Sequence, residues 1–281
     1  MPAPARDRDQ ARPIGRKTLA IFLAVAFGFS WAQWLGALAS ARGWISWRVP
    51  LTPLGAFGPA LGALAALAVS REPCAVRRWA ASIVRWRMPA WTALAACLLP
   101  PAAAAAAFLS AAAVTGVRVP PKLPTPGFFF AATLEILILG GPLGEEPGWR
   151  GYLLAGLRRK MGPTGATLSV AAIWLAWHVP LFFVPGSAQT QIPFLPFALS
   201  IAAEAFLLTW LFESTGGGTL VAILAHTSFN ATFLFAARGI LERHQDDLFW
   251  PIYLALIVTA ALLVWWKSPV FRGRRVLKAD G

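Results

Sequence analysis

Long stretches without a charged residue constrain this chain more than any other feature of its sequence. Residues 161–203 contain no Asp, Glu, Lys or Arg, and residues 18–41 are also uncharged. About 20 apolar residues in a helix are enough to cross the hydrocarbon core of a bilayer. A helix also satisfies its own backbone hydrogen bonds there, which few other structures do. The sequence therefore predicts an all-α, polytopic transmembrane helical bundle.

Turn-forming and charged segments divide the apolar sequence into about eight expected spans. The segment PGSAQTQIP at 185–193, for example, interrupts a run that is otherwise continuous. We expect the bundle to cover residues 18–266, between basic cytoplasmic tails at 1–17 and 267–281. The expected spans are 18–41, 49–70, 91–117, 127–144, 163–184, 194–212, 219–237 and 250–266.

The composition agrees with a membrane protein and argues against a nucleic-acid-binding one. The chain is 57% hydrophobic and only 13% charged, which is about half the charged share of a soluble domain. A net charge of +13 would suggest nucleic acid as the partner of a soluble chain. Here the basic residues lie in loops, where the positive-inside rule explains them. The two cysteines, Cys74 and Cys97, lack metal-ligand spacing and predict no disulfide.

The distribution of basic residues also predicts the orientation of the chain. Cytoplasmic loops are enriched in Lys and Arg. With the N-terminus placed in the cytoplasm, an even number of spans puts most of the 25 basic residues inside. We therefore expect a multi-pass protein of the cell membrane with both termini cytoplasmic. The basic residues left on the outer side are Arg42, Arg48, Arg118, Lys122, Arg238 and Arg243.

The segment GEEPGWRGYLL at 144–154 places three ionisable residues beside long apolar runs. Such residues are costly inside a bilayer and usually pair with one another. Glu146 and Arg150 are four apart, so on a helix they share a face and can form an ion pair. Glu145 points about 100° away and is left free to act on another group. The alternative is a juxtamembrane salt bridge that ends a helix.

Two histidines in apolar runs have polar or aromatic residues at helical same-face spacing. Trp174 precedes His178 by one turn, and Asn230 follows His226 by one turn. A lone histidine in a membrane is often only a hydrogen-bond partner between helices. Together with the carboxylates, however, these residues suit amide hydrolysis. A carboxylate and a histidine can deprotonate a water, and a second histidine and an asparagine amide can donate to the oxyanion.

We therefore predict that Glu145, His178, His226 and Asn230 converge in one cavity, because burying them apart from one another is costly. A zinc site is the alternative chemistry for three of these residues. Glu145, His178 and His226 would supply two His and one Glu, a known catalytic ligand set. The usual H-E-x-x-H string is absent.

The motifs resemble those of the CAAX protease and bacteriocin-processing (CPBP) family of intramembrane proteases, also called the abortive-infection family. The similarity covers roughly residues 125–235. One position departs from the family pattern, where Trp stands in place of Phe. The patterns E-E-x-x-x-R, F-x-x-x-H and H-x-x-x-N are matched in order by Glu145, Glu146 and Arg150, by Trp174 and His178, and by His226 and Asn230.

The resemblance implies an all-helical membrane fold with a conical cavity open to the cytosol and a protease core at about 125–235. It implies an endopeptidase that cleaves a membrane-associated or prenylated, CAAX-like substrate, with Trp174 and Trp177 contacting that substrate. Both a metalloprotease and a metal-free glutamate–histidine mechanism are associated with the family. We favour the metal-free mechanism, with zinc as the alternative cofactor. The expected partners are the lipid bilayer and a hydrophobic or lipidated peptide.

Two other function classes are compatible with the composition. A non-catalytic immunity or scaffold protein of the same family would keep the cavity without turnover, but the intact motif residues argue against it. A transporter would use Glu135 and Glu204 as proton-relay groups, but the sequence shows no internal repeat. We expect these two glutamates to be buried and hydrogen-bonded or paired, with Arg150 as a candidate partner. Glu213 and His244 are expected to be solvated.

Overall fold

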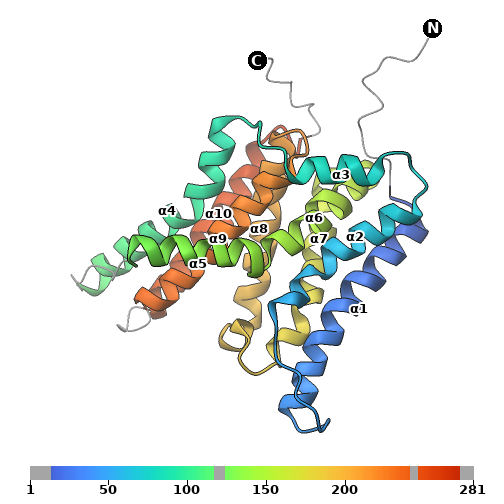
Figure 1. Ribbon diagram of the computed structural model, residues 1–281. Coiled ribbons are helices and arrows are strands. Elements are labelled where there is room, and N and C mark those ends of the chain that lie inside the picture. Colours follow the sequence, from blue (N-terminus) through green and yellow to red (C-terminus); the bar gives the residue numbers. More distant parts are fainter. Residues whose placement is uncertain (1–13, 117–123, 241–245, 273–281) are drawn as a thin grey trace.

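The computed structural model of the chain describes residues 14–116, 124–240 and 246–272 (Figure 1). Every regular element in these three ranges is a helix. Several of the helices are long and apolar enough to cross a membrane. The expected fold class, an all-α polytopic membrane bundle, is therefore confirmed. Most of both expected tails, and His244, lie outside the described residues.

The bundle consists of long helices connected by short helical turns. Helix α1 packs against α2, α4 packs against α9 and α10, and α8 packs against α7, α9 and α10. In chain order the elements are α1 (Arg16–Ala41), η2 (Pro53–Phe57), α2 (Gly58–Val69), α3 (Ala75–Ile83), α4 (Ala90–Thr115), α5 (Pro126–Leu139), α6 (Pro142–Gly148), η3 (Trp149–Leu154), α7 (Ala155–His178), η4 (Val179–Phe182), η5 (Ala188–Gln191), α8 (Phe194–Ser214), α9 (Thr219–Ile240) and α10 (Asp246–Lys267).

The described residues contain 6 helical stretches that can span a membrane, compared with about eight expected from the sequence. The expected span at 49–70 is the shorter apolar helix Pro53–Val69. At 1.5 Å per residue this helix reaches roughly 25 Å, less than the hydrocarbon core of about 30 Å. The expected span 127–144 and nearly all of the expected span 163–184 fall within one stretch, Pro126–Phe182, whose helices follow one another almost without a connecting loop.

The expected helix at 127–144 is interrupted just before the acidic motif. Helix α5 ends at Leu139, and Gly141 then adopts a φ of +112°, a conformation that favours glycine. Helix α6 starts directly afterwards with Pro142, a residue suited to the first turn of a helix. The motif therefore begins a new helix, so its two glutamates lie in or next to the first turn of α6 rather than at the end of a long span.

Glycines in the motif let α6 approach its neighbours closely. A Cβ at Gly144 would lie 2.5 Å from the carbonyl oxygen of Ala56, and a Cβ at Gly148 would collide with Pro59. Both partners belong to the η2–α2 segment, so the acidic motif packs directly on this segment. After Gly148 the chain forms the π-helical turn η3. Such turns are rare in proteins, and those that occur are often found at functional sites.

One end of the bundle, here called the basic end, is formed by the start of α1, helix α3, the start of α7 and the turn between α8 and α9. Figure 1 shows α3 at the same end as the start of α1 and the last turns of α10. Arg85 donates to the carbonyl oxygen of Gly216 at 3.0 Å, which connects the segment after α3 to the α8–α9 turn. Arg158 pairs with Glu213. The expectation that Glu213 is solvated is therefore wrong, because this arginine lies beside it.

The expectation that Glu135 is buried is also wrong. Glu135 is exposed on the surface of α5, and the buried residue of this helix is Ala132. Glu204 differs, since it is partly buried on α8 and interacts electrostatically with Arg150. Sequence spacing gave no signal to distinguish these glutamates, because both lie in apolar runs and only the packing of their helices separates them.

Candidate active site

Glu146 lies at the centre of a buried charge cluster. Its Oε1 accepts a hydrogen bond from Arg150 Nη1 at 2.8 Å and lies 2.8 Å from Nδ1 of His226. Glu146 and Arg150 are both 0% exposed. The ion pair with Arg150 follows the i, i+4 spacing of the sequence. The contact with His226 does not, because it joins α6 to α9 across a separation of 80 residues.

Trp174 on α7 connects this charge cluster to the second carboxylate. Its indole Nε1 donates to Glu145 Oε2 at 2.6 Å. The guanidinium carbon of Arg150 lies 4.5 Å from the centre of the same ring, a cation–π contact worth up to about 2 kcal/mol when desolvated. The adjacent glutamates therefore have different partners. Glu145 accepts from an indole, whereas Glu146 contacts an arginine and a histidine.

The hydrogen bonds of the two histidines place a proton on Nδ1 of both rings. Nδ1 of His178 lies 2.9 Å from the carbonyl oxygen of Trp174, and a carbonyl only accepts, so Nδ1 carries the proton. In the neutral ring Nε2 of His178 is then an acceptor. Nδ1 of His226 faces the Glu146 carboxylate and donates to it. Nε2 of His226 can therefore donate only when this ring is doubly protonated and positively charged.

Asn230, one turn after His226 on α9, contacts the backbone between α5 and α6. Its Nδ2 donates to the carbonyl oxygen of Gly140 at 3.1 Å. An amide nitrogen carries two N–H donors, so this bond leaves the second N–H for another acceptor. The asparagine thus fixes the backbone just before the acidic motif and retains a donor of its own.

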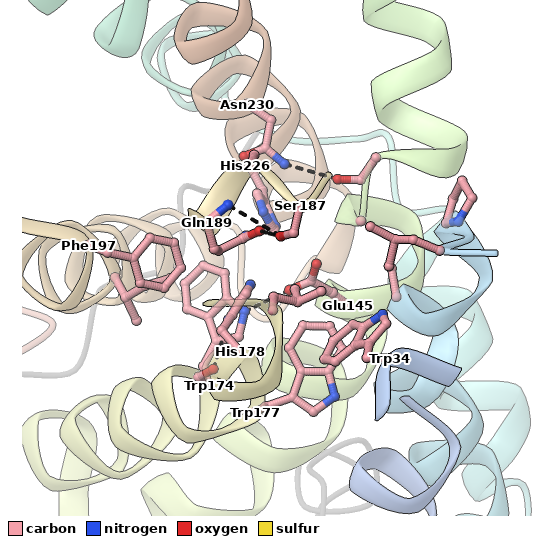
Figure 2. Close-up of a pocket in the computed structure, with 18 of the residues that line it drawn as sticks. Trp34, Glu145, Trp174, Trp177, His178, Ser187, Gln189, Phe197, His226 and Asn230 are labelled. Carbon is pink, nitrogen blue, oxygen red and sulfur yellow. Dashed lines mark hydrogen bonds between the residues drawn. The ribbon is translucent and has the colours of Figure 1, made fainter. Parts of the chain in front are cut away.

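A cavity of about 480 Å³ brings the predicted residues together. Figure 2 shows Glu145, His178 and His226 arranged around one space. Glu146 and Arg150 are not among the lining residues, so the ion pair lies behind the cavity wall. The predicted residues that line the cavity are Glu145, Trp174, Trp177, His178, His226 and Asn230.

Five polar residues that the sequence did not assign to the site also line this cavity: Thr52, Ser187, Gln189, Ser200 and Glu204. Ser187 donates to Gln189 Oε1 at 2.5 Å in the connection between α7 and α8. The polar string PGSAQTQIP inside an uncharged stretch was a usable signal for these two residues. Glu204 was recognised as an ionisable residue in an apolar span, but its spacing did not relate it to the motifs on other helices.

Several buried polar atoms of the charge cluster have no hydrogen-bond partner within the described part of the chain. They are Oε2 of Glu146 and both Nε and Nη2 of Arg150. Unsatisfied buried groups are costly and uncommon. The hydrogen bonds of the Glu146–Arg150 pair therefore offset only part of the free-energy cost of burying the two charges. This incomplete compensation is a reason to relate the pair to function as well as to stability.

Glu145, His178 and His226 are not arranged as the three-ligand zinc site that the sequence also allowed. In the ranges that the structure describes, no group of three His, Cys, Asp or Glu residues is arranged to hold a metal ion. Oε2 of Glu145 binds the indole of Trp174. Nδ1 of His226 binds Glu146, and Nδ1 of His178 binds a backbone carbonyl, so Nε2 is the nitrogen of each ring that remains for another group. Their remaining atoms face one cavity without forming a ligand cluster.

The cavity lies toward the end of the bundle opposite the basic end. Its lining includes residues 51–53 and 186–189, which belong to the connections after α1 and α7. In Figure 1 these connections lie away from α3. A cytoplasmic basic end would place these connections, and the part of the cavity that they line, on the outer side of the membrane. The charge-based orientation and the cytosol-facing cavity implied by the family resemblance therefore assign this part of the bundle to different sides of the membrane.

Comparisons with known proteins agree with the motifs. Residues 126–232 match the family model for type II CAAX prenyl endopeptidases, Rce1-like. A curated relative, "CAAX prenyl protease 2" from Methanococcus maripaludis, is 28% identical over 148 residues, or 50% of this chain. The matched region covers 52% of that relative, so the chain spans about half its length. Both comparisons confirm that this chain resembles the CPBP family, as the three motifs on α6, α7 and α9 indicated.

Proposed function

We propose that the protein is an intramembrane endopeptidase in which Glu145 activates the attacking water. The observation that carries this proposal is the division between the adjacent glutamates. Glu145 lines the cavity, whereas Glu146 is held by Arg150 and His226 behind its wall. A general base must reach its water within hydrogen-bond distance, and of the two carboxylates Glu145 meets that requirement.

In the proposed reaction, the Glu145 carboxylate takes a proton from a water bound in the cavity. The acceptor Nε2 of neutral His178 orients the same water. The water oxygen then bonds to the carbonyl carbon of the scissile peptide bond, and the carbonyl electrons move to its oxygen. Protonated Glu145 returns the proton to the leaving nitrogen as the C–N bond breaks.

His226 and Asn230 are proposed to stabilise the oxyanion of the tetrahedral intermediate. The second N–H of Asn230 is available for this purpose. Nε2 of His226 donates in the positively charged ring, whose charge the Glu146 carboxylate balances. Preorganised donors of this kind typically contribute about a hundredfold to a thousandfold in rate each. The ion pair behind the wall therefore positions His226 rather than contacting the substrate.

The proposed substrate is a peptide with a large apolar portion, such as a prenylated, CAAX-like C-terminus. The cavity wall combines the polar residues with Trp34, Trp177 and Phe197. Such a pairing of aromatic walls and a few polar groups is typical of sites that bind amphipathic ligands. The name of the Methanococcus maripaludis relative, a CAAX prenyl protease, supports the same substrate class. The surrounding bilayer would deliver a lipidated peptide to this site.

Comparative peptide analysis of membranes tests the proposed activity. Cells expressing the wild type, Glu145→Ala or Glu135→Ala would be compared by mass spectrometry. Glu135 is a matched control, because it is an exposed glutamate of α5 outside the cavity lining. We expect cleaved peptides with the wild type and Glu135→Ala that are missing with Glu145→Ala. The same peptides in all three samples would contradict the proposal.

Peptide cleavage by the purified protein is expected to survive chelation. The lining histidines and Glu145 form no ligand cluster, and Asn230 offers an amide suited to an oxyanion donor. Activity would be measured before and after dialysis against EDTA or 1,10-phenanthroline. Inactivation by both chelators, with recovery on adding Zn²⁺, would contradict the metal-free mechanism.

Labelling of single cysteines is expected to place the connection after α7 and the basic end on opposite sides of the membrane. Cys74 is an exposed native cysteine at the start of α3 and would be labelled in a Cys97→Ser background. Gln189→Cys would be labelled in a background without native cysteines. A membrane-impermeant maleimide should reach Gln189→Cys in intact cells and Cys74 only after permeabilisation. The reverse pattern would support the cytosol-facing cavity, and labelling of both from one side would contradict the fold.

A further inference from the structure

A second cavity, of about 580 Å³, lies at the basic end and is separate from the candidate active site. It is bounded by the start of α1, helix α3, the start of α7 and the turn at Gly216 and Gly217. The lining contains one carboxylate, that of Glu72, and a larger number of cationic side chains. Those cationic residues are Arg78, Arg85, Arg158 and Arg159.

The contacts of two of these arginines leave hydrogen-bond donors for a ligand. Arg85 donates from Nη1 to the carbonyl oxygen of Gly216. Arg78 donates from Nη1 to Pro73 at 2.9 Å and from Nη2 to Glu72 at 3.3 Å. A guanidinium carries five N–H donors in a planar fork, so neither side chain is saturated by these bonds. A guanidinium often donates two parallel N–H bonds to two oxygens of one phosphate, so a phosphate group is the ligand that these arginines suit.

The cavity lies where lipid headgroups are expected. Its walls are the ends of helices, including the start of α1 and the segment after α2, and helix ends lie at the membrane–water interface. Helix α3, which forms one wall, combines Arg77 and Arg78 with Trp79 in a short amphipathic helix. Basic amphipathic helices and tryptophan side chains are characteristic of that interface. Basic pockets between membrane helices on the cytoplasmic side bind anionic headgroups.

We propose that this cavity binds the phosphate of an anionic phospholipid headgroup, with Arg78 and Arg85 as principal ligands. A free phosphate ion has the same chemistry, so the experiment must distinguish the two sources. The lipid is favoured by the position of the cavity at the helix ends beside α3. The proposal does not depend on peptidase activity, because none of the four arginines lines the candidate active site.

The test is the thermal unfolding of the purified full chain in detergent with increasing amounts of dioctanoyl phosphatidylglycerol. Parallel titrations use dioctanoyl phosphatidylcholine and inorganic phosphate. The variant Arg78→Gln with Arg85→Gln removes two charges from the cavity. The matched control, Arg77→Gln with Arg87→Gln, removes two charges from the same exposed segment but from outside the lining.

We expect phosphatidylglycerol to raise the midpoint of unfolding of the wild type and of the control variant. With about 1.5 kcal/mol for the charge-assisted hydrogen bonds of each arginine, the cavity variant should need roughly a hundredfold more lipid for the same rise. Phosphatidylcholine should have little effect. Equal lipid dependence of the two double variants would overturn the proposal. An equal rise with inorganic phosphate would replace the lipid with a free anion.

A charge-preserving variant keeps the test valid if the glutamine variant fails to fold. Arg78→Lys with Arg85→Lys retains both charges but loses the paired donors of the forks. Native mass spectrometry would count the phosphatidylglycerol molecules that stay bound to it and to the wild type. Weaker retention by the lysine variant is expected. Unchanged retention would show that the arginine forks do not recognise the headgroup.

Discussion

Replacing Glu145 with glutamine is expected to reduce peptide cleavage by about a thousandfold, the typical contribution of a general base. Glutamine has the same shape and can still accept the hydrogen bond from Trp174 Nε1, so the fold should persist. The change removes the negative charge that takes the proton of the water. Turnover of a quenched fluorescent peptide and the midpoint of thermal unfolding in detergent would be measured on the same preparation.

The control for this prediction is Glu135→Gln, which removes an exposed carboxylate from α5. It should retain both cleavage and thermal stability. Full activity of Glu145→Gln would contradict the proposed base. A large loss of stability in Glu145→Gln, with Glu146→Gln folded but inactive, would mean that the two glutamates have exchanged roles.

Replacing Glu146 with glutamine is expected to destabilise the protein and also lower its activity. The change leaves Arg150 charged and without its carboxylate at a position that is 0% exposed. Breaking a buried ion pair by removing one partner typically costs about 3–5 kcal/mol. The midpoint of thermal unfolding and the yield of folded protein should therefore both fall. Activity should fall as well, because His226 loses the charge that orients it.

The double variant Glu146→Gln with Arg150→Met separates these two effects. Removing both charges should recover part of the lost stability, since no unpaired arginine remains. Cleavage should not recover to the same extent, because His226 still lacks its carboxylate partner. Recovery of stability and activity together would contradict the positioning role of Glu146. No recovery of stability would contradict the view that unpaired Arg150 causes the loss.

The fold class was predictable because it follows from one simple quantity, the length of uncharged apolar runs. The end of one expected helix was not predictable in this way, because a local backbone conformation sets it. Gly141, with its positive φ, ends the expected helix 127–144 early and starts α6. The sequence shows that Gly140 and Gly141 are adjacent, but two adjacent glycines do not by themselves specify a positive φ at the second. The number of spans is sensitive to such breaks, whereas the presence of a helical bundle is not.

The candidate site was predictable to the extent that its contacts lie within one helix. The pair of Glu146 and Arg150 follows from a spacing of four residues. The contact of Glu146 with His226 and the contact of Trp174 with Glu145 join different helices, so no spacing rule could produce them. Glu204 shows the same limit, because its place in the cavity wall depends on how α8 packs. Motif order can thus indicate which residues meet, but not which atoms bond.

The indole of Trp174 restricts the rotation of the Glu145 carboxylate beside it. In the family pattern a phenylalanine ring stands at this position. A phenyl ring could still lie over Arg150, but it has no N–H to donate to Glu145. With tryptophan, the Glu145 carboxylate is held in one rotamer before any substrate arrives. This chain thus fixes the direction of its proposed base in advance, and it gives up one lone pair of that base as a proton acceptor.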